Sequence, residues 1–211
     1  MTETFRPEFT EWPKTPRLFR DIVITEKIDG TNAAIGIRRL DWTDDINEPP
    51  ADFTITAIGD DEYAVYAQSR KRIITPASDN YGFARWVHEN AQELTTLLGP
   101  GLHFGEWWGQ GIQRRYGIDE KRFSLFNTGK WSALVPRHVG SALVGTVPVI
   151  YQGVFDEARI RHALLSLQVH GSHAAAGFMN PEGVCVYHSQ TRNVFKVTLD
   201  NYDAGKWEAA A

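Results

Sequence analysis

The apolar and polar positions of this chain follow two spacings. Alternation with a period of two predicts strands at residues 32–38, 53–58 and 64–69, and an apolar run at residues 22–24 precedes them. Apolar residues at helical spacing predict a helix over residues 81–98, which ends before Gly99-Pro100. A second helix is predicted from near Asp156, a residue type that caps helices, to just before Gly171.

Further strands are predicted at residues 102–107, 123–126, 147–151, 183–187 and 194–198. Many strands with two intercalated helices, in no strict alternation of strand and helix, are typical of an α+β domain with antiparallel sheets. The acidic, proline-bearing stretch at residues 41–52 is predicted to be a surface loop within this domain.

Composition narrows the class of protein. The 211 residues are 42% hydrophobic and 23% charged, which suits one large domain or two small ones. No leader pattern and no apolar run of transmembrane length is present, and the single Cys185 excludes an intramolecular disulfide and a cysteine-based zinc site. We therefore expect a cytoplasmic protein. The net charge of −4 argues against non-specific coating of nucleic acid, although residues 70–72, 114–115 and 121–122 form short basic clusters.

One hexapeptide, Lys-Ile-Asp-Gly-Thr-Asn at residues 27–32, carries candidate chemistry. Lys27 follows the apolar run and precedes an Asp-Gly pair. A lysine amine held there could attack a phosphorus atom and carry a nucleotide as a covalent adduct. Asp-Gly is also among the commonest turn pairs, so the hexapeptide alone is equally consistent with a surface hairpin.

Other charged residues stand at the ends of predicted strands or inside them. Arg70 and Glu106 stand at the ends of strands, Glu182 opens one, and Lys196 lies inside another. A charge in such a place is costly if the fold buries it without a partner. Each one alone is better explained as a strand-end charge that faces water, but together they could satisfy one another around an anionic ligand and a metal.

This set of residues resembles the covalent nucleotidyltransferase superfamily of ATP-dependent DNA ligases, RNA ligases and mRNA capping enzymes. The family's motif, Lys-x-Asp-Gly-x followed by Asn or Arg, matches residues 27–32. With Asn32 at its end and Glu26 just before it, the motif most resembles that of RNA ligases that seal nicks in duplex RNA, as in phages and trypanosome editing. The resemblance extends from Phe19 to Lys196. It implies a nucleotidyltransferase (ATP-grasp-like) fold with antiparallel sheets flanked by helices.

The resemblance also implies a role for each matching residue. Lys27 would react with ATP to form lysyl-AMP. The nucleotide-binding residues would be Glu26, Ile28, Thr31, Asn32, Arg70, Glu106, Phe126, Glu182 and Lys196. Among these, Glu26 and the backbone near Ile28 would contact adenine, and Phe126 would stack on it. Thr31 and Asn32 would help hold the nucleotide and the reacting ends.

The remaining roles concern the sugar, the phosphates and the metal. Glu106 would contact the ribose, Arg70 a phosphate or the donor end, and Lys196 the α-phosphate. Glu182 would associate with a metal, and its oxygen ligands suit Mg²⁺ or Mn²⁺. The implied activity is ATP-dependent joining of 3′-hydroxyl and 5′-phosphate RNA ends, on a nicked duplex or on single strands.

Two features depart from the family pattern. Val194 stands where the family has the first lysine of its final Lys-x-Lys motif, and fifteen residues follow Lys196. We therefore expect residues 1–211 to form a single adenylyltransferase domain with no C-terminal OB or helical domain. A partner protein that supplies grip on nucleic acid would complement such a domain.

Other interpretations stay open at this point. A DNA ligase or a capping-type nucleotidyltransferase would carry the same motifs, and so would a nucleotide-binding domain that has lost strand joining. His162, His170 and His173 are interpreted as surface histidines rather than metal ligands, because their spacing is wide and no cysteine accompanies them.

Overall fold

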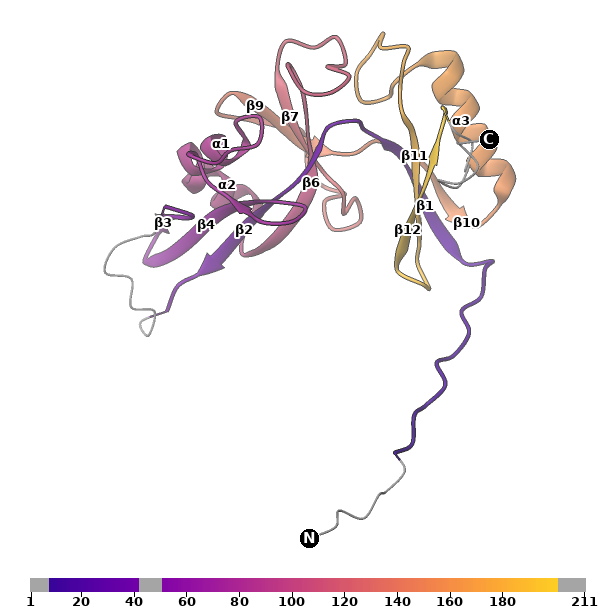
Figure 1. Cartoon of the computed structure of the whole chain (residues 1–211), viewed down its shortest axis with the longest axis horizontal. Coiled ribbons are helices and arrows are strands. Elements are labelled where there is room, and N and C mark those ends of the chain that lie inside the picture. The colour runs from indigo at the N-terminus through magenta and orange to yellow at the C-terminus, as the bar shows by residue number, and fades with distance from the viewer. Residues whose placement is uncertain (1–7, 42–50, 201–211) are drawn as a thin grey trace.

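The computed structural model describes residues 8–41 and 51–200, and within these ranges the chain forms two sheets and three helices (Figure 1). This architecture confirms the predicted α+β class. Most of the predicted surface loop, residues 42–50, lies outside the described residues. No helix in the described part of the chain is long and apolar enough to cross a membrane.

The larger sheet has the strand order β3-β4-β2-β6-β7-β9-β8, with β5 paired to the side of β4. Its strands are β2 (Thr31–Arg39), β3 (Thr54–Ile58), β4 (Asp61–Ser69), β5 (Ile73–Ile74), β6 (Gly101–Gly109), β7 (Lys121–Leu125), β8 (Arg137–Val139) and β9 (Ala142–Thr146). The prediction of antiparallel sheets is wrong for one pair, since β7 and β9 run parallel. The sequence did not predict β5, β8 or β9, which are short and lack a long alternating pattern.

The smaller sheet is antiparallel throughout its described strands and has the order β10-β1-β11-β12. Its strands are β1 (Asp21–Lys27), β10 (Val149–Val154), β11 (Gly183–His188) and β12 (Asn193–Thr198). The predicted strand at 147–151 overlaps β10, but Val147 and Pro148 lie in the connection from β9. Proline has no N–H to give to a sheet, so a strand begins more readily after it.

The predicted helix over residues 81–98 is instead two helices, α1 (Phe83–Glu89) and α2 (Ala91–Leu98). The break lies at Asn90, whose φ of −117° is not helical. Its side-chain Nδ2 donates to the Trp86 carbonyl at 2.7 Å, and such local side-chain bonds compete with a continuous helix. The third helix, α3 (Glu157–His170), begins as predicted after Asp156, whose carboxylate accepts the N–H of Ala158, and ends before Gly171.

Each sheet has its own apolar core. Helices α1 and α2 cover one face of the larger sheet, where Phe83, Trp86 and Trp107 are buried together. Helix α3 packs on the face of the smaller sheet that points away from the larger sheet (Figure 1), and Leu167 is buried there in one cluster with apolar residues of β1 and β11. A third cluster, which includes Ile28, lies where the chain passes from one sheet to the other.

The passage from β1 to β2 comes very close to β6. A Cβ atom added to Gly30 would lie 2.5 Å from the Trp107 carbonyl oxygen and 2.7 Å from the Cβ of Trp108. Real Cβ atoms do not approach other atoms this closely, so only glycine fits without a shift of the backbone. The approach brings the start of β2 beside Glu106, which pairs across the sheet with Asn32.

The core beneath α3 gives a stability prediction. Leu167 is fully buried, whereas Leu165 in the same helix is 54% exposed. We expect Leu167→Ala to lower the free energy of unfolding by about 2–5 kcal/mol, because it removes buried methyl groups and leaves a cavity. Leu165→Ala is the matched control and should cost well under 1 kcal/mol. Urea unfolding followed by circular dichroism measures both, and equal losses would contradict this account of the core.

Candidate functional site

Lys27 stands at the end of β1 and forms an ion pair with Glu182. Its Nζ lies 2.5 Å from Glu182 Oε2, and the two side chains are 24% and 18% exposed. The pairing follows from the sheet, because Lys27 lies opposite Gly183, the residue after Glu182. The two residues are 155 positions apart in the sequence, so the antiparallel pairing of β1 and β11 brings them together.

Glu106 is the second carboxylate beside Lys27. Its Oε1 accepts the backbone N–H of Gly30 at 3.1 Å. Burial raises the pKa of Glu106 to about 7, while the charge of Lys27 and the Gly30 hydrogen bond act in the opposite direction. A carboxyl group with this pKa changes its charge near neutral pH, which is a common property of functional sites.

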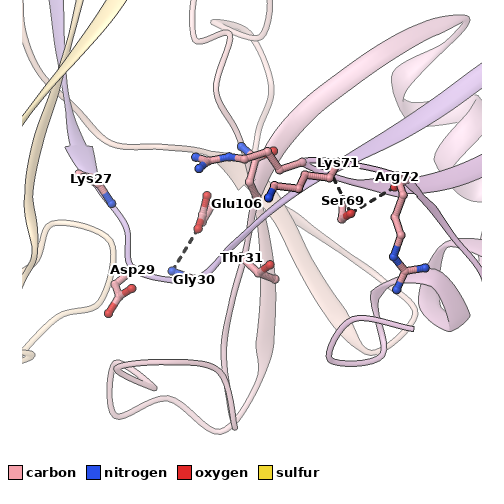
Figure 2. A pocket seen from close by; sticks show the side chains of 10 residues that line it. Lys27, Asp29, Gly30, Thr31, Ser69, Lys71, Arg72 and Glu106 are labelled. Carbon is pink, nitrogen blue, oxygen red and sulfur yellow. Dashed lines mark hydrogen bonds between the residues drawn. The ribbon is translucent and has the colours of Figure 1, made fainter. Parts of the chain in front are cut away.

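These residues line a pocket of about 580 Å³ (Figure 2). Its lining consists of Lys27, Asp29, Gly30, Thr31, Asn32, Ser69, Arg70, Lys71, Arg72 and Glu106. The volume lies within the range of small-molecule sites, about 300–1,000 Å³. The wall opposite Lys27 is the turn after β4, which carries three consecutive cations and is closed by a hydrogen bond from the Ser69 N–H to the Arg72 carbonyl. The pocket therefore suits a ligand with several negative charges.

Three of the predicted nucleotide-binding residues stand at this wall or beside it. Arg70 is exposed and makes no hydrogen bond or ion pair to any described residue, so its guanidinium is available to a ligand. Thr31 is already held by the protein, since its hydroxyl accepts a hydrogen bond from Asn80 Nδ2 at 2.7 Å. Asn32 begins β2 beside Glu106.

Lys196 lies on the same face of the smaller sheet as Lys27. It pairs with Cys185, which pairs in turn with Thr25, and side chains two positions apart on a strand share a face. The surroundings of Cys185 agree with this placement. Burial raises the pKa of its thiol, the charges of Lys27 and Lys196 act to lower it, and two neighbouring carboxylates act to raise it.

Glu26 lies on the opposite face from Lys27, and the structure does not bring it to the pocket. Its carboxylate accepts hydrogen bonds from the Ser172 hydroxyl at 2.6 Å and from the His173 and Ala174 N–H groups at 2.7 and 2.9 Å. The side chain is 1% exposed, and burial raises its pKa. Glu26 thus fastens the segment after α3 to the smaller sheet.

The other two residues predicted to meet adenine also lie outside the pocket lining. The Ile28 side chain is buried in the cluster between the sheets, with Trp108 and Tyr116. Phe126 follows β7, where its N–H donates to the Phe104 carbonyl, and its ring is 39% exposed.

Glu182 is the residue that the sequence predicts to bind a divalent metal. Among the described residues no group of three or more histidine, cysteine, aspartate or glutamate side chains is arranged around a common point. Mg²⁺ commonly takes only one or two carboxylates from a protein and completes its shell with water and phosphate, so Glu182 fits a metal that arrives with a nucleotide. His162, His170 and His173 are exposed, which confirms their interpretation as surface histidines.

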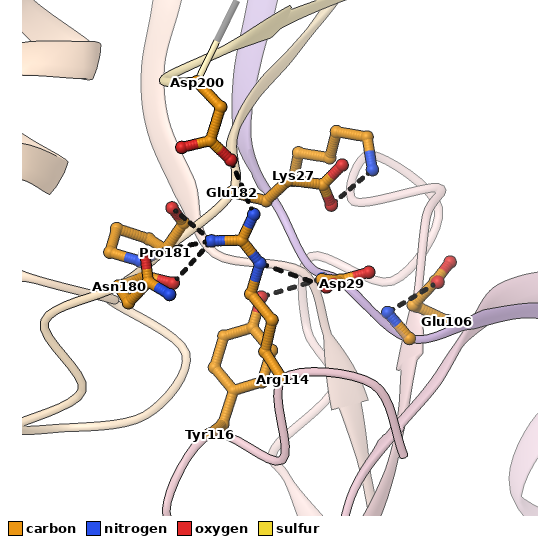
Figure 3. Close-up of polar contacts among 10 residues, drawn as sticks. Lys27, Asp29, Glu106, Arg114, Tyr116, Asn180, Pro181, Glu182 and Asp200 are labelled. Carbon is orange, nitrogen blue, oxygen red and sulfur yellow. Dashed lines mark hydrogen bonds and ion pairs between the residues drawn. The ribbon is translucent and has the colours of Figure 1, made fainter.

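Two residues beside the hexapeptide had no local sequence signal. Tyr116 accepts the Asp29 N–H on its hydroxyl at 2.7 Å, and burial raises the pKa of that hydroxyl above its ordinary range. Arg114 donates from Nε to Asp29 Oδ2 at 3.0 Å (Figure 3). In the sequence Arg114 is distinguished only as part of a basic cluster, because both contacts span more than 80 residues.

Comparisons with known proteins place the chain in a family. An RNA ligase of Naegleria gruberi, in the apo structure of a lysine-to-alanine mutant, matches with a TM-score of 0.44 and 12% sequence identity over 87% of this chain. The match covers 50% of that protein, so the chain spans about half its length. No curated protein matches the chain. The family model described as RNA ligase matches residues 20–198, which is most of the sequence, and the chain therefore belongs to the RNA ligase family.

Proposed function

We propose that this chain is an ATP-dependent RNA ligase domain with a nucleotidyltransferase fold, in which Lys27 carries AMP as a covalent adduct. The observation that carries the proposal is the placement of Lys27 Nζ 2.5 Å from Glu182, at the edge of a pocket whose far wall holds three cations. Membership of the RNA ligase family supports RNA as the substrate class.

In the first proposed step Lys27 attacks the α-phosphorus of ATP. A nitrogen–phosphorus bond forms, the bond to the bridging oxygen breaks, and pyrophosphate leaves. The amine must lose a proton to become neutral, and Glu182 is the carboxylate close enough to receive it. Lys196, on the same face of the sheet, would neutralise charge that builds on the α-phosphate.

The phosphates and the sugar would be held by other residues of the pocket. Arg70, which has no described partner, suits a phosphate or the donor end. Glu106 would accept a hydrogen bond from a ribose hydroxyl when it is ionised, and could donate one to the ribose when it is protonated. A divalent metal held by Glu182 and the phosphates would supply further charge neutralisation at the reacting phosphorus.

The later proposed steps move AMP to RNA and then release it. A 5′-phosphate oxygen of RNA attacks the α-phosphorus, which frees Lys27 and forms a new phosphoanhydride. A 3′-hydroxyl then attacks the RNA 5′-phosphorus, so that the strand is sealed and AMP leaves. Grip on RNA would come from the basic turn at residues 70–72 or from a partner protein.

Loss of the nucleophile gives the direct test of this function. With ATP labelled at the α-phosphate and Mg²⁺ or Mn²⁺, we expect the wild-type chain to acquire acid-labile, alkali-stable label. Lys27→Ala should acquire none, because no other side chain is proposed to form the bond. Lys14→Ala removes an exposed lysine that does not line the pocket and should be labelled like wild type. Absence of label on the wild type with either metal would refute the proposal.

A chase separates RNA ligation from the alternatives. We expect nicked duplex RNA or single-stranded RNA ends to discharge the labelled protein and yield joined strands on a denaturing gel. Preferential discharge by nicked DNA would instead indicate a DNA ligase, and labelling by GTP rather than ATP a capping-type enzyme. Label that no nucleic acid removes would indicate a domain that has lost strand joining.

The raised pKa of Glu106 gives a prediction on stability and pH. The folded protein holds this proton more tightly than the unfolded chain, so the stabilisation is complete below pH 4.5 and is lost as the pH rises through about 7. Glu106→Gln keeps an oxygen acceptor for the Gly30 N–H and removes the titration. We expect its Tm to exceed that of wild type at pH 8, by about 2–4 °C for each kcal/mol of difference in the free energy of unfolding. The difference in Tm should shrink towards pH 5.

Differential scanning fluorimetry at intervals between pH 5 and pH 8 measures this difference. Glu62→Gln, at an exposed position of β4, is the matched control and should run parallel to wild type at every pH. Parallel curves for Glu106→Gln as well would show that Glu106 does not titrate in this range.

A further inference from the structure

Arg114 connects three separate segments that surround Lys27 (Figure 3). Its Nε donates to Asp29 Oδ2 at 3.0 Å, two residues after Lys27. Its Nη1 donates to the Asn180 carbonyl at 3.0 Å and to the Pro181 carbonyl at 3.3 Å, directly before Glu182. Its Nη2 pairs with Asp200 at 2.9 Å, after the end of β12. One planar group therefore holds the segments that carry both members of the Lys27–Glu182 pair.

The loop that presents Arg114 is built around it. On either side, Ile112 and Tyr116 are buried and anchor the loop in two different clusters. Gln113, Arg115 and Tyr116 have positive φ angles of 44°, 60° and 51°, which side chains other than glycine seldom adopt. Such a backbone persists only where its surroundings fix it, and such sites cluster where geometry matters for function.

We propose that Arg114 is a positioning residue for the nucleophile: it fixes Asp29 and the 180–182 segment to the loop between β6 and β7, and so sets the approach of Lys27 to Glu182 and to a bound nucleotide. This inference rests on the function proposed above. Arg114 itself does not line the pocket, so it acts through Asp29 and Glu182 rather than on the ligand.

The chemistry of the contacts requires a guanidinium. Arg114 donates to two carboxylates, two backbone carbonyls and the side-chain oxygen of Asn180. Arginine offers five N–H groups in a fixed plane, whereas a lysine ammonium offers three from a single point. Arg114→Lys should therefore keep the charge and only part of the geometry.

The test is the single-turnover rate at which Lys27 acquires AMP. Because a misplacement of about 1 Å can cost on the order of 100-fold in rate, we expect Arg114→Ala to lose about that factor. The ATP concentration for half-maximal rate should change less than the rate, since Arg114→Ala replaces none of the residues that line the pocket. Arg114→Lys should lie between the two, and added guanidinium at millimolar concentration should restore part of the rate of Arg114→Ala.

The neighbouring Arg115 supplies a matched control. It lies in the same loop and is exposed, and its side chain makes no polar contact to a described residue, so Arg115→Ala makes the same change in charge and should keep the wild-type rate. A wild-type rate in Arg114→Ala or Arg114→Lys would overturn the proposal. An equal loss in Arg115→Ala would do the same, and so would a loss in Arg114→Ala that neither guanidinium nor lysine relieves.

A second readout separates this inference from the proposed function. Hydrogen exchange of residues 28–31 and 180–184 should be faster in Arg114→Ala than in wild type or Arg115→Ala, whether or not an adduct forms. Faster exchange in a protein that acquires no label would support Arg114 as the residue that positions these segments and would refute only the ligase chemistry. Unchanged exchange would overturn the proposed positioning role of Arg114, even if the protein is an active ligase.

Discussion

The close approach of Gly30 to β6 is the constraint on which the site depends. The chain must pass from the smaller sheet to the larger one within three residues, and it does so with its backbone almost against the Trp107 carbonyl. This proximity lets the Gly30 N–H reach Glu106 and sets the register of β2 on β6. Lys27 and Glu106 therefore come from different sheets but are held close together, because only three residues separate Lys27 from β2 and β2 pairs with the strand of Glu106.

Much of the secondary structure could be predicted because its signals are local. Period-two alternation identified β2, β3 and β4, and Asp156 and Gly171 marked the ends of α3. The helix break at Asn90 was harder, since it depends on a side-chain bond to Trp86 that competes with an otherwise continuous apolar stripe. The parallel pairing of β7 and β9 is a matter of tertiary arrangement, which short apolar segments do not encode individually.

The site was predictable to the extent that its residues occupy recognisable strand ends. Lys27, Arg70 and Glu106 line one pocket, and Glu182 joins them through its ion pair. Glu26 shows the limit of that approach, because adjacency in sequence places it on the opposite face of the sheet, where it holds the segment after α3. The role of Arg114 could not be predicted, because its partners are 66 to 86 residues away in the sequence and no local pattern indicates them.

The alternation of β1 makes a single strand serve two purposes that cannot be exchanged. Ile24 and Glu26 point towards α3 and its following segment, while Thr25 and Lys27 point towards the site. A deletion or insertion of one residue upstream of Lys27 within this strand would reverse both sets, so that the lysine would turn to the buried face and away from the site. The length of β1 is therefore tied to both of its faces, whereas a substitution that keeps the alternation leaves the register unchanged.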